Sequence, residues 1–181
     1  SVSTDTRTLT PGQLFFALRG ERFDAAEFVA DAALRGAAGA VVEQFTSAGL
    51  PQVEVADSRL ALGALARKWR QHFVLPMIGI TGSNGKTTVK EMLASILQPA
   101  GEVLATQGNY NNELGVPLSL FGLEPRHRFA VLEMGASKAG DIAYLAGIAR
   151  PDVALVTNVG PAHLGGFGSL EGVARAKGEI Y

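Results

Sequence analysis

A glycine-rich stretch, Thr81-Gly82-Ser83-Asn84-Gly85-Lys86-Thr87-Thr88, has the residue types of a loop that binds phosphate. Its glycines let the backbone turn so that successive N–H groups point at an anion. Lys86 supplies a full positive charge, and the Thr87 hydroxyl can ligate a Mg²⁺ ion that bridges phosphates. The usual pattern has another glycine where this chain has Ile80, so an ordinary strand-to-helix turn is the alternative. The stretch predicts a nucleotide-binding protein.

Further polar residues could share in this chemistry. Glu133 ends an apolar run and could hold Mg²⁺, although a solvated acid at a strand end is the alternative. His163 lies in a glycine-rich turn and could contact phosphate or nothing, because Mg²⁺ prefers oxygen ligands. Asn109, Asn111 and Asn112 offer amide donors and acceptors, but asparagine is also a common turn residue.

Near the start of the chain, Ser3-Thr4-Asp5-Thr6-Arg7 gathers hydroxyls, an acid and an arginine. Such a set could bind a hydroxyl-rich or phosphorylated ligand, with Arg7 as the phosphate or carbonyl partner. A polar N-terminal tail would have the same composition. Lys177, near the other end, reads from sequence alone as a surface lysine.

The elements around the glycine-rich stretch alternate between strands and helices. Apolar runs that begin at Met77 and span 102–105, 129–134 and 153–157 are predicted strands. Helices are predicted from about 86 to just before Pro99, over 139–149 and over 169–181. Continuous apolar strands separated by helices predict a parallel sheet covered on both faces. Because ligands gather at the C-terminal ends of such strands, the phosphate loop, Glu133 and the turn 157–163 should converge.

The first 74 residues predict a smaller α/β unit, with strands over 14–18, 40–42 and 53–55 and helices over 25–34 and about 57–72. Two helices carry apolar stripes at three- and four-residue spacing. The stripes are Leu62, Leu65, Ala66, Trp69 and Phe73 in one helix, and Val89, Met92, Leu93, Ile96 and Leu97 in the helix after the phosphate loop. Residues 72–76 are the expected join, which divides the chain into domains 1–74 and 75–181.

Composition narrows the class of protein. Hydrophobic residues make up 47% of the 181 residues, and the formal net charge is −1 with no block of like charge. These values predict a well-cored soluble protein and argue against a nucleic-acid or membrane surface. The sequence shows no apolar run long enough to span a membrane, and no signal peptide is expected. Cysteine is absent, which excludes disulfides and thiolate metal sites. A cytoplasmic monomer is expected.

With these residues assembled, the chain resembles the Mur ligase family over its whole length. The phosphate loop is shared by the wider family, and further stretches carry the likeness. They are Thr4-Asp5-Thr6-Arg7, Pro11-Gly12, Leu14-Phe15, Gly20-Glu21-Arg22-Phe23-Asp24, Asn109-Tyr110-Asn111-Asn112-Glu113-Leu114-Gly115-Val116-Pro117, Glu133-Met134-Gly135, Ala162-His163-Leu164-Gly165-Gly166-Phe167-Gly168-Ser169 and Gly172-Val173-Ala174-Arg175-Ala176-Lys177-Gly178-Glu179-Ile180.

Family members have a UDP-substrate domain, a central ATPase and a C-terminal Rossmann-like domain. The resemblance implies an α/β fold in which 1–74 is the UDP-substrate domain with a trimmed start. It further implies that 75–181 is part of the central parallel-sheet P-loop ATPase domain, and that the third domain is absent. The chain is thus expected to be a fragment.

The implied reaction is ATP-dependent amide-bond formation in peptidoglycan precursor synthesis. The Asn-rich loop and the last two stretches resemble the member that adds D-alanyl-D-alanine to UDP-N-acetylmuramoyl-tripeptide. A substrate carboxylate attacks the γ-phosphate, which gives an acyl phosphate and ADP. The incoming amine then attacks the acyl carbon, and phosphate leaves.

The resemblance also implies roles for particular residues. Lys86 contacts the β- and γ-phosphates, while Thr87 and Glu133 bind one Mg²⁺. His163 helps to bind a second Mg²⁺, and Lys177 matches a lysine that the family converts to a carbamate with carboxylate-like oxygens.

Other matched residues complete the two expected sites. The nucleotide loop comprises Gly82, Ser83, Asn84, Gly85, Lys86, Thr87 and Thr88, and Asn109 and Asn112 match a loop near the γ-phosphate. Thr4, Asp5, Thr6 and Arg7 match the uridine-nucleotide site.

One departure and two alternatives remain. Where many members carry a histidine after Asp-Ala or Asp-Gly, this chain has Asp24-Ala25-Ala26, so a substrate contact through that histidine is not expected. The first alternative is the family member that adds the third residue to UDP-N-acetylmuramoyl-dipeptide. The second is a nucleotide- or UDP-sugar-binding module that catalyses nothing by itself.

Overall fold

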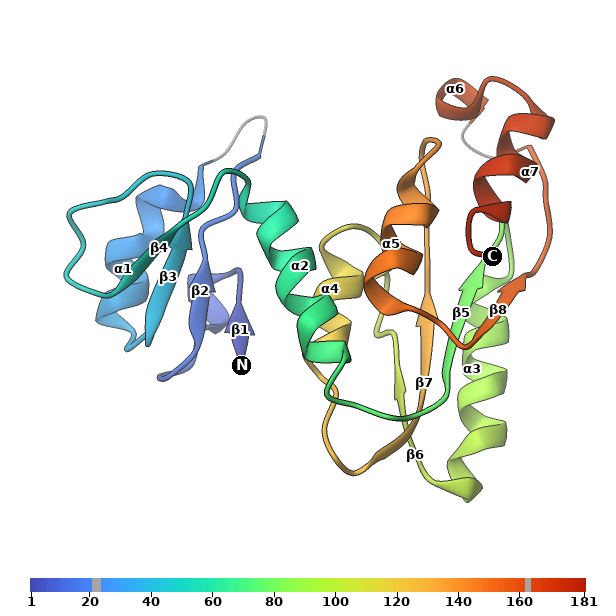
Figure 1. The fold of residues 1–181 in the computed structure, drawn as a ribbon, viewed down its shortest axis with the longest axis horizontal. Helices are drawn as coiled ribbons and strands as arrows, with labels where there is room; N and C mark the ends of the chain where they lie inside the picture. The colour runs from blue at the N-terminus through green and yellow to red at the C-terminus, as the bar shows by residue number, and fades with distance from the viewer. Residues whose placement is uncertain (21–23, 162–163) are drawn as a thin grey trace. The chain divides into compact units, whose positions relative to one another are not determined.

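The computed structural model describes residues 1–20, 24–161 and 164–181 and divides into two compact units, Ser1–Ala64 and Leu65–Tyr181. Each unit contains its own four-stranded parallel sheet (Figure 1). The predicted α/β class is confirmed, and so is the parallel sheet predicted for the second segment of the chain. Among the described residues, none of the helices is both long enough and apolar enough to cross a membrane.

The sheet of the first unit has the order β1-β2-β3-β4. Its strands are β1 (Val2–Ser3), β2 (Leu14–Phe16), β3 (Gly39–Val42) and β4 (Gln52–Glu54). Phe15 pairs with Ser3 on one side and with Ala40 on the other, which places it in the middle of the sheet. It packs in an apolar core with Val29, Ala32 and Val42.

Helical segments flank these strands and differ in detail from the expectation. They are η1 (Thr6–Thr8), η2 (Ala25–Phe28) and α1 (Val29–Leu34). The helix predicted over 25–34 therefore begins as a 3₁₀ turn, in which Asp24 Oδ1 accepts a hydrogen bond from Ala26 N at 2.9 Å. Strand β1 was not predicted, because two residues are too few to show a period.

The second unit has the strand order β6-β7-β5-β8, and all neighbouring pairs are parallel. Its strands are β5 (Met77–Thr81), β6 (Glu102–Ala105), β7 (His127–Glu133) and β8 (Val153–Val156). Strands β5 and β7 lie at the centre, with Ile80 paired to Glu133. This register brings the carboxyl ends of the two central strands together, directly below the phosphate loop.

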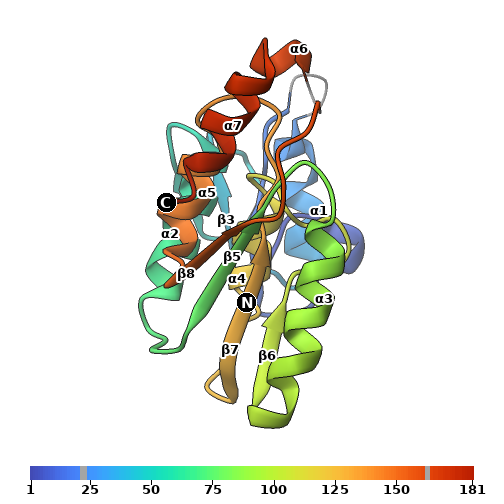
Figure 2. The same ribbon diagram turned by 90° about the vertical axis from the view of Figure 1, so that its right-hand side faces the viewer.

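Helices cover both faces of this sheet. The helices of the chain beyond the first unit's α1 are α2 (Ser58–Arg70), α3 (Lys86–Leu97), η3 (Gln98–Ala100), α4 (Gly115–Leu120), α5 (Asp141–Ala149), α6 (Leu164–Phe167) and α7 (Leu170–Gly178). Helix α3 packs on β6 and β7 from one side, and α4 and α5 pack on the other side (Figure 2). Alternate residues of β7 face the two layers: Leu132 joins the α4–α5 core, whereas Glu133 meets α3.

The predicted apolar stripe of α3 is only partly buried: Val89, Leu93 and Leu97 are half-buried, but the other two members are exposed. Met92 and Ile96 are 60% and 70% exposed, whereas Lys90 is only 2% exposed. Helix α3 turns its Lys90 side toward β6 and β7, because Lys90 finds a buried carbonyl there. The stripe of α2 is divided in the same way: Leu62 and Ala66 are buried, but Leu65 and Trp69 stay partly exposed.

The division between the two units falls inside α2, earlier than the expected 74/75 join. The second half of this helix belongs to the second unit, since Ala66 enters its core. Arg70 donates to Ala149 O at 3.1 Å and to Phe73 O at 2.6 Å. The first bond ties the end of α2 to the end of α5, and the second ties it to the segment that leads into β5.

Candidate nucleotide site

The loop between β5 and α3 has a backbone that only glycine adopts easily. Gly82 has φ +144° and Gly85 has φ +78°. A Cβ at Gly82 would collide with the Thr157 hydroxyl, so the loop and the end of β8 approach closely. Both glycines named in the sequence pattern therefore have a physical reason at their positions.

The first turn of α3 opens toward the loop. Gly85 occupies the N-cap position and offers no side-chain acceptor, and the first N–H bonded within the helix is Val89 N to Gly85 O at 3.0 Å. The N–H groups of the first turn come before Val89 and have no acceptor within the helix, so they present the positive end of the helix dipole. Lys86 Nζ donates to Gly82 O at 2.9 Å and lies at the same opening. An anionic phosphate fits this combination of donors and charge.

The turn after β8 braces the phosphate loop. Ser83 N donates to Asn158 O at 3.1 Å, and Asn84 N donates to Asn158 Oδ1 at 3.1 Å. Thr157 Oγ1 donates to Asn84 O at 2.7 Å. The sequence indicated this turn only because it follows a predicted strand. Its bracing role could not be predicted, because the residues in contact lie more than seventy positions apart in the sequence.

A nearly buried carboxylate lies behind the loop. Glu133, at the end of β7, is 3% exposed. Its Oε2 accepts from Thr87 Oγ1 at 2.8 Å, and its Oε1 accepts from Asn111 Nδ2 at 2.7 Å. The structure thus unites Thr87 and Glu133 and adds Asn111. Sequence reasoning singled out the asparagine loop, but it assigned the nucleotide contacts to Asn109 and Asn112.

The other two asparagines are placed differently. Asn112 lines the cavity described below, and its Oδ1 accepts from Gly115 N at 2.8 Å at the start of α4. Asn109 is exposed and does not line that cavity. His163 lies outside the described residues. The roles expected for these residues stay predictions.

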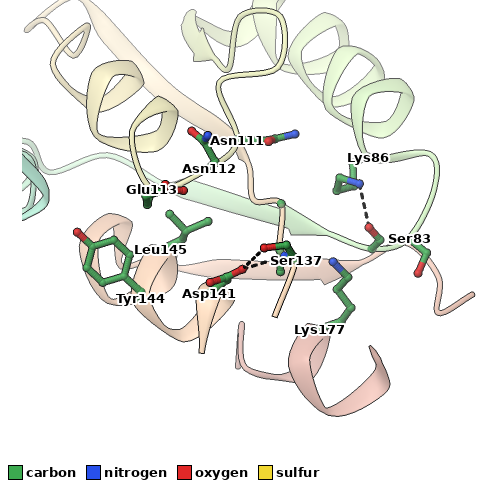
Figure 3. A pocket seen from close by; sticks show the side chains of 13 residues that line it. Ser83, Lys86, Asn111, Asn112, Glu113, Ser137, Asp141, Tyr144, Leu145 and Lys177 are labelled. Carbon is green, nitrogen blue, oxygen red and sulfur yellow. Dashed lines mark hydrogen bonds between the residues drawn. The ribbon is translucent and has the colours of Figure 1, made fainter. Parts of the chain in front are cut away.

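A cavity of about 360 Å³ adjoins the phosphate loop. Figure 3 shows its lining side chains, which come from the phosphate loop, the asparagine loop, the segment after β7, α5 and α7. The lining residues are Gly82, Ser83, Lys86, Asn111, Asn112, Glu113, Gly135, Ala136, Ser137, Asp141, Tyr144, Leu145 and Lys177. Both cationic side chains of this set, Lys86 and Lys177, project into the cavity.

Lys177 is a cavity lysine and not the surface lysine that sequence alone indicated. It projects from α7 and is 2% exposed. Burial lowers the pKa of its amine below the ordinary value of 10.5, and the charge of Lys86 lowers it further. Asp141 and Glu179 act in the opposite direction without restoring the ordinary value. The neutral, nucleophilic amine is therefore more accessible here than in an exposed lysine.

Acidic side chains hold the wall around Lys177. Asp141 Oδ2 accepts from Ser137 N at 2.8 Å, Ser137 Oγ at 3.0 Å and Lys138 N at 3.0 Å. Burial alone would raise the pKa of Asp141, but these hydrogen bonds outweigh it and lower the pKa below 3.8. Glu179 accepts from Gly140 N at 2.9 Å and from Ala143 N at 3.1 Å, and so ties α7 to the start of α5.

The donor set next to the loop fits Mg²⁺. Carboxylate and hydroxyl oxygens are the hard ligands that this ion prefers. Adjacent oxygens of an octahedral Mg²⁺ shell lie about 2.9 Å apart, given metal–oxygen distances of roughly 2.0–2.1 Å. Thr87 Oγ1 and Glu133 Oε2 are separated by 2.8 Å. Lys177 fits as a ligand only after modification, because its ammonium repels a cation.

The first unit gathers the predicted front residues around a separate cavity of about 480 Å³. Its lining residues are Thr4, Asp5, Thr6, Arg7, Phe15, Ala25 and Phe28. Arg7 Nη2 lies 2.6 Å from Asp5 Oδ2, and Arg7 Nε donates to Asp5 Oδ1 at 2.9 Å. This bonding lowers the pKa of Asp5 to about 2. The cluster is thus an ordered part of the fold and not a polar tail.

The strand–loop–helix geometry, the oxygen donors and the lysine-lined cavity are those of the phosphate-loop class of α/β proteins. Residues 80–181 match the family model described as the Mur ligase middle domain. Because this match covers more than half of the chain, the chain belongs to the Mur ligase family.

Relatives with known names show the same likeness. The chain is 51% identical over 181 residues to the UDP-N-acetylmuramoyl-tripeptide--D-alanyl-D-alanine ligase of Escherichia coli (strain K12), covering 100% of this chain and 40% of the relative. It is 43% identical over 183 residues to the ligase of the same name from Bacillus subtilis (strain 168), covering 99% of this chain and 40% of the relative. The chain thus spans about two fifths of the length of these relatives.

Solved structures agree with these matches. A crystal structure of MurF from Acinetobacter baumannii has a TM-score of 0.96 at 49% identity, covering 99% of this chain and 40% of that chain. The structure of MurF ligase from Thermotoga maritima in complex with ADP has a TM-score of 0.92 at 40% identity, covering 99% of this chain and 42% of that chain.

Proposed function

We propose that this chain is the UDP-substrate and nucleotide-binding portion of an ATP-dependent ligase that adds D-alanyl-D-alanine to UDP-N-acetylmuramoyl-tripeptide. The observation that carries the proposal is the Thr87–Glu133 oxygen pair, 2.8 Å apart, behind a phosphate loop whose Lys86 shares a cavity with Lys177. Relatives that bear this ligase name are 51% and 43% identical to the chain. ATP is the proposed co-substrate, and the related Thermotoga maritima MurF was solved with ADP.

The proposed chemistry proceeds in two steps. An oxygen of the tripeptide carboxylate attacks the γ-phosphorus, the bond from that phosphorus to the ADP oxygen breaks, and an acyl phosphate forms. The amine of D-alanyl-D-alanine then attacks the acyl carbon, loses a proton and displaces phosphate. Two anions must approach each other in the first step, so the site has to supply positive charge and hold both reactants in place.

The chain's own groups meet this requirement in part. The first-turn N–H groups of α3 and the Lys86 ammonium hold the β- and γ-phosphates. Thr87 and Glu133 would hold one Mg²⁺, which when bound neutralises charge on the phosphate oxygens. Asn111 keeps the Glu133 carboxylate oriented through its bond of 2.7 Å.

Lys177 is proposed to act as a carbamate. Its neutral amine would attack CO₂ and lose a proton, which yields an anion with two oxygens. This change removes the repulsion between Lys177 and Lys86 and adds oxygen donors at the cavity. A second Mg²⁺ would then be held by the carbamate and by His163.

The first unit is proposed to bind the uridine nucleotide. The cavity that includes Thr4, Thr6 and Arg7 offers hydroxyl and guanidinium donors beside the apolar surface of Phe15 and Phe28. Such a combination suits a base and a phosphorylated sugar. The reaction consumes ATP and a nucleotide-linked sugar, and we place it in the cytoplasm.

Calorimetric titration tests this assignment. We expect the chain to bind UDP-N-acetylmuramoyl-tripeptide more tightly than the corresponding dipeptide. Equal binding would leave the ligase that adds the third residue as an alternative. One such ligase, for 2,6-diaminopimelate, shares the fold at a TM-score of 0.64 but only 21% identity. Failure to bind either compound would overturn the role of the first unit.

Because the chain covers 40% of its named relatives, residues 1–181 alone are expected to act as a binding module without ligase turnover. The check is release of ADP that depends on D-alanyl-D-alanine. Robust release by the purified chain would contradict this expectation.

A further inference from the structure

Lys90 lies on α3, one helical turn after the phosphate-loop residues Lys86 and Thr87, but its side chain turns away from the cavity. It is 2% exposed, and within α3, which the structure describes completely, it is the only fully buried residue. An apolar residue would be expected at a position that faces β6 and β7. Burial of an ammonium group is costly unless the group is paired and hydrogen-bonded. The position therefore calls for a specific explanation.

The partners of Lys90 supply one. Its Nζ donates to Thr106 O at 2.6 Å and lies 2.7 Å from Glu91 Oε1. Thr106 directly follows β6 and begins the asparagine loop. Thr106 is itself 1% exposed, and its N–H donates to Val131 O at 3.1 Å. Lys90 thus anchors the first residue of that loop to helix α3.

Thr106 in turn forms a hydrogen bond with the backbone of Glu133, whose carboxylate is an expected Mg²⁺ ligand. Thr106 Oγ1 accepts from Glu133 N at 2.9 Å. The Glu133 side chain then accepts from Thr87 and from Asn111. A continuous set of short contacts therefore runs from Lys90 through Thr106 to Glu133 and back to α3 at Thr87. This set includes both expected Mg²⁺ ligands, Glu133 and Thr87, and none of its four residues lines the cavity.

We propose that Lys90 is a positioning residue: it fixes Thr106, and through it Glu133, at the distance from Thr87 that Mg²⁺ requires. The inference rests on the proposed nucleotide function, because it assigns Lys90 to the same site. Lys90 lies outside the cavity lining and acts only through Thr106. Outer partners of metal ligands commonly affect metal affinity by about 10–100-fold.

The test compares ADP binding by the chain in the presence of Mg²⁺ and of a chelator. For Lys90→Met, which keeps the length of the side chain and removes its charge and donors, we expect metal-free ADP affinity to stay near wild type. The gain in ADP affinity on adding Mg²⁺ should fall by about 10–100-fold. Hydrogen exchange of the Glu133 amide in the ligand-free chain should accelerate in the same variant, because its acceptor is no longer held.

Two controls separate positioning from other effects. Glu91→Gln removes the ion pair of Lys90 but leaves its bond to Thr106 and should keep the Mg²⁺-dependent gain. Lys68→Met removes an exposed lysine of α2 and should change nothing. If Lys90→Met does not fold, Thr106→Val decides the question, because it removes the acceptor for Glu133 N and keeps the carbonyl that Lys90 uses. Thr106→Ser, which keeps the hydroxyl, is its matched control.

Each result has a definite meaning. A Lys90→Met or Thr106→Val variant that folds and retains the full Mg²⁺-dependent gain overturns the inference. Equal losses with and without Mg²⁺ also overturn it, since they indicate a general loss of structure. If the wild-type chain itself does not bind ADP, the proposed nucleotide function fails and the inference falls with it.

Discussion

The Thr87 hydroxyl donates a hydrogen bond of 2.8 Å to Glu133 Oε2, although 46 positions separate the two residues. Strand β5 leads through the phosphate loop into the helix that carries Thr87, and β7 ends at Glu133. The two strands are neighbours in the sheet, with Ile80 paired to Glu133. Parallel pairing at the centre of the sheet is therefore what forms the expected metal site.

Glu133→Gln tests that site directly. The amide keeps the shape of the side chain but removes its charge, which Mg²⁺ requires of a strong ligand. We expect the gain in ADP affinity on adding Mg²⁺ to fall by about 10–100-fold, by analogy with losses at other metal-ligand shells. Titration calorimetry with and without a chelator measures it. An unchanged gain would remove Glu133 from the metal site.

Lys86→Met tests the phosphate loop. Hydrogen bonds to charged groups contribute about 1.5–3 kcal/mol, so ADP affinity should fall roughly 10–100-fold even without Mg²⁺. Metal-free binding thus separates Lys86 from Glu133, whose replacement should leave it nearly intact. Lys68→Met, on an exposed part of α2, is the matched control. Wild-type affinity in Lys86→Met would exclude Lys86 from the phosphate contacts.

Lys177 is predicted to form a carbamate. Burial and the charge of Lys86 lower the pKa of its amine, so the neutral form that attacks CO₂ is present at lower pH than for an ordinary lysine. Incubation with ¹³C-bicarbonate should give a carbamate carbon resonance that strengthens as pH rises and is absent in Lys177→Arg. Resonances of equal strength in the two proteins would show that another amine reacts.

Asp141 should make the stability of the chain depend on pH. Its pKa is lowered in the folded state, because hydrogen bonds from Ser137 and Lys138 outweigh the effect of burial. Its contribution is therefore present above 3.8, the ordinary value, and is lost as pH falls through the lower folded value.

The corresponding measurement uses Asp141→Asn. At neutral pH the free energy of unfolding of the variant should be lower by about 1.5–3 kcal/mol, the scale of hydrogen bonds to a charged acceptor. The difference from wild type should shrink as the pH is lowered toward the folded pKa. Denaturant unfolding at several pH values gives both results. A difference that is constant over the acid range would mean that the Asp141 charge makes no contribution.

Several parts of this molecule follow from local patterns. Gly82, Gly85, Lys86 and Thr87 are recognisable because glycine conformation and helix-start chemistry are local properties. The parallel sheet of the second unit follows from continuous apolar runs between helices. The short helix Gly115–Leu120 was not predicted, since a six-residue helix with a central proline shows no clear period.

What the sequence could not reveal depends on contacts between distant segments. The periodicity of α3 favours Met92 and Ile96 as its buried residues, but the structure buries Lys90. The Thr106 carbonyl accepts a hydrogen bond from the Lys90 ammonium and so offsets the cost of its burial. The Asn111 amide could be recognised as a partner of Glu133 only once β7 and the asparagine loop were placed together.

The sequence by itself determined the phosphate loop, the α/β class and the family resemblance, all of which depend on residue types at short, regular spacing. The tertiary structure alone decided that Lys177 is buried beside Lys86, and that Thr87, Asn111 and Glu133 bond to one another. The physical reason is that burial, charge proximity and hydrogen-bond partnership depend on which strands pair and which helix faces pack.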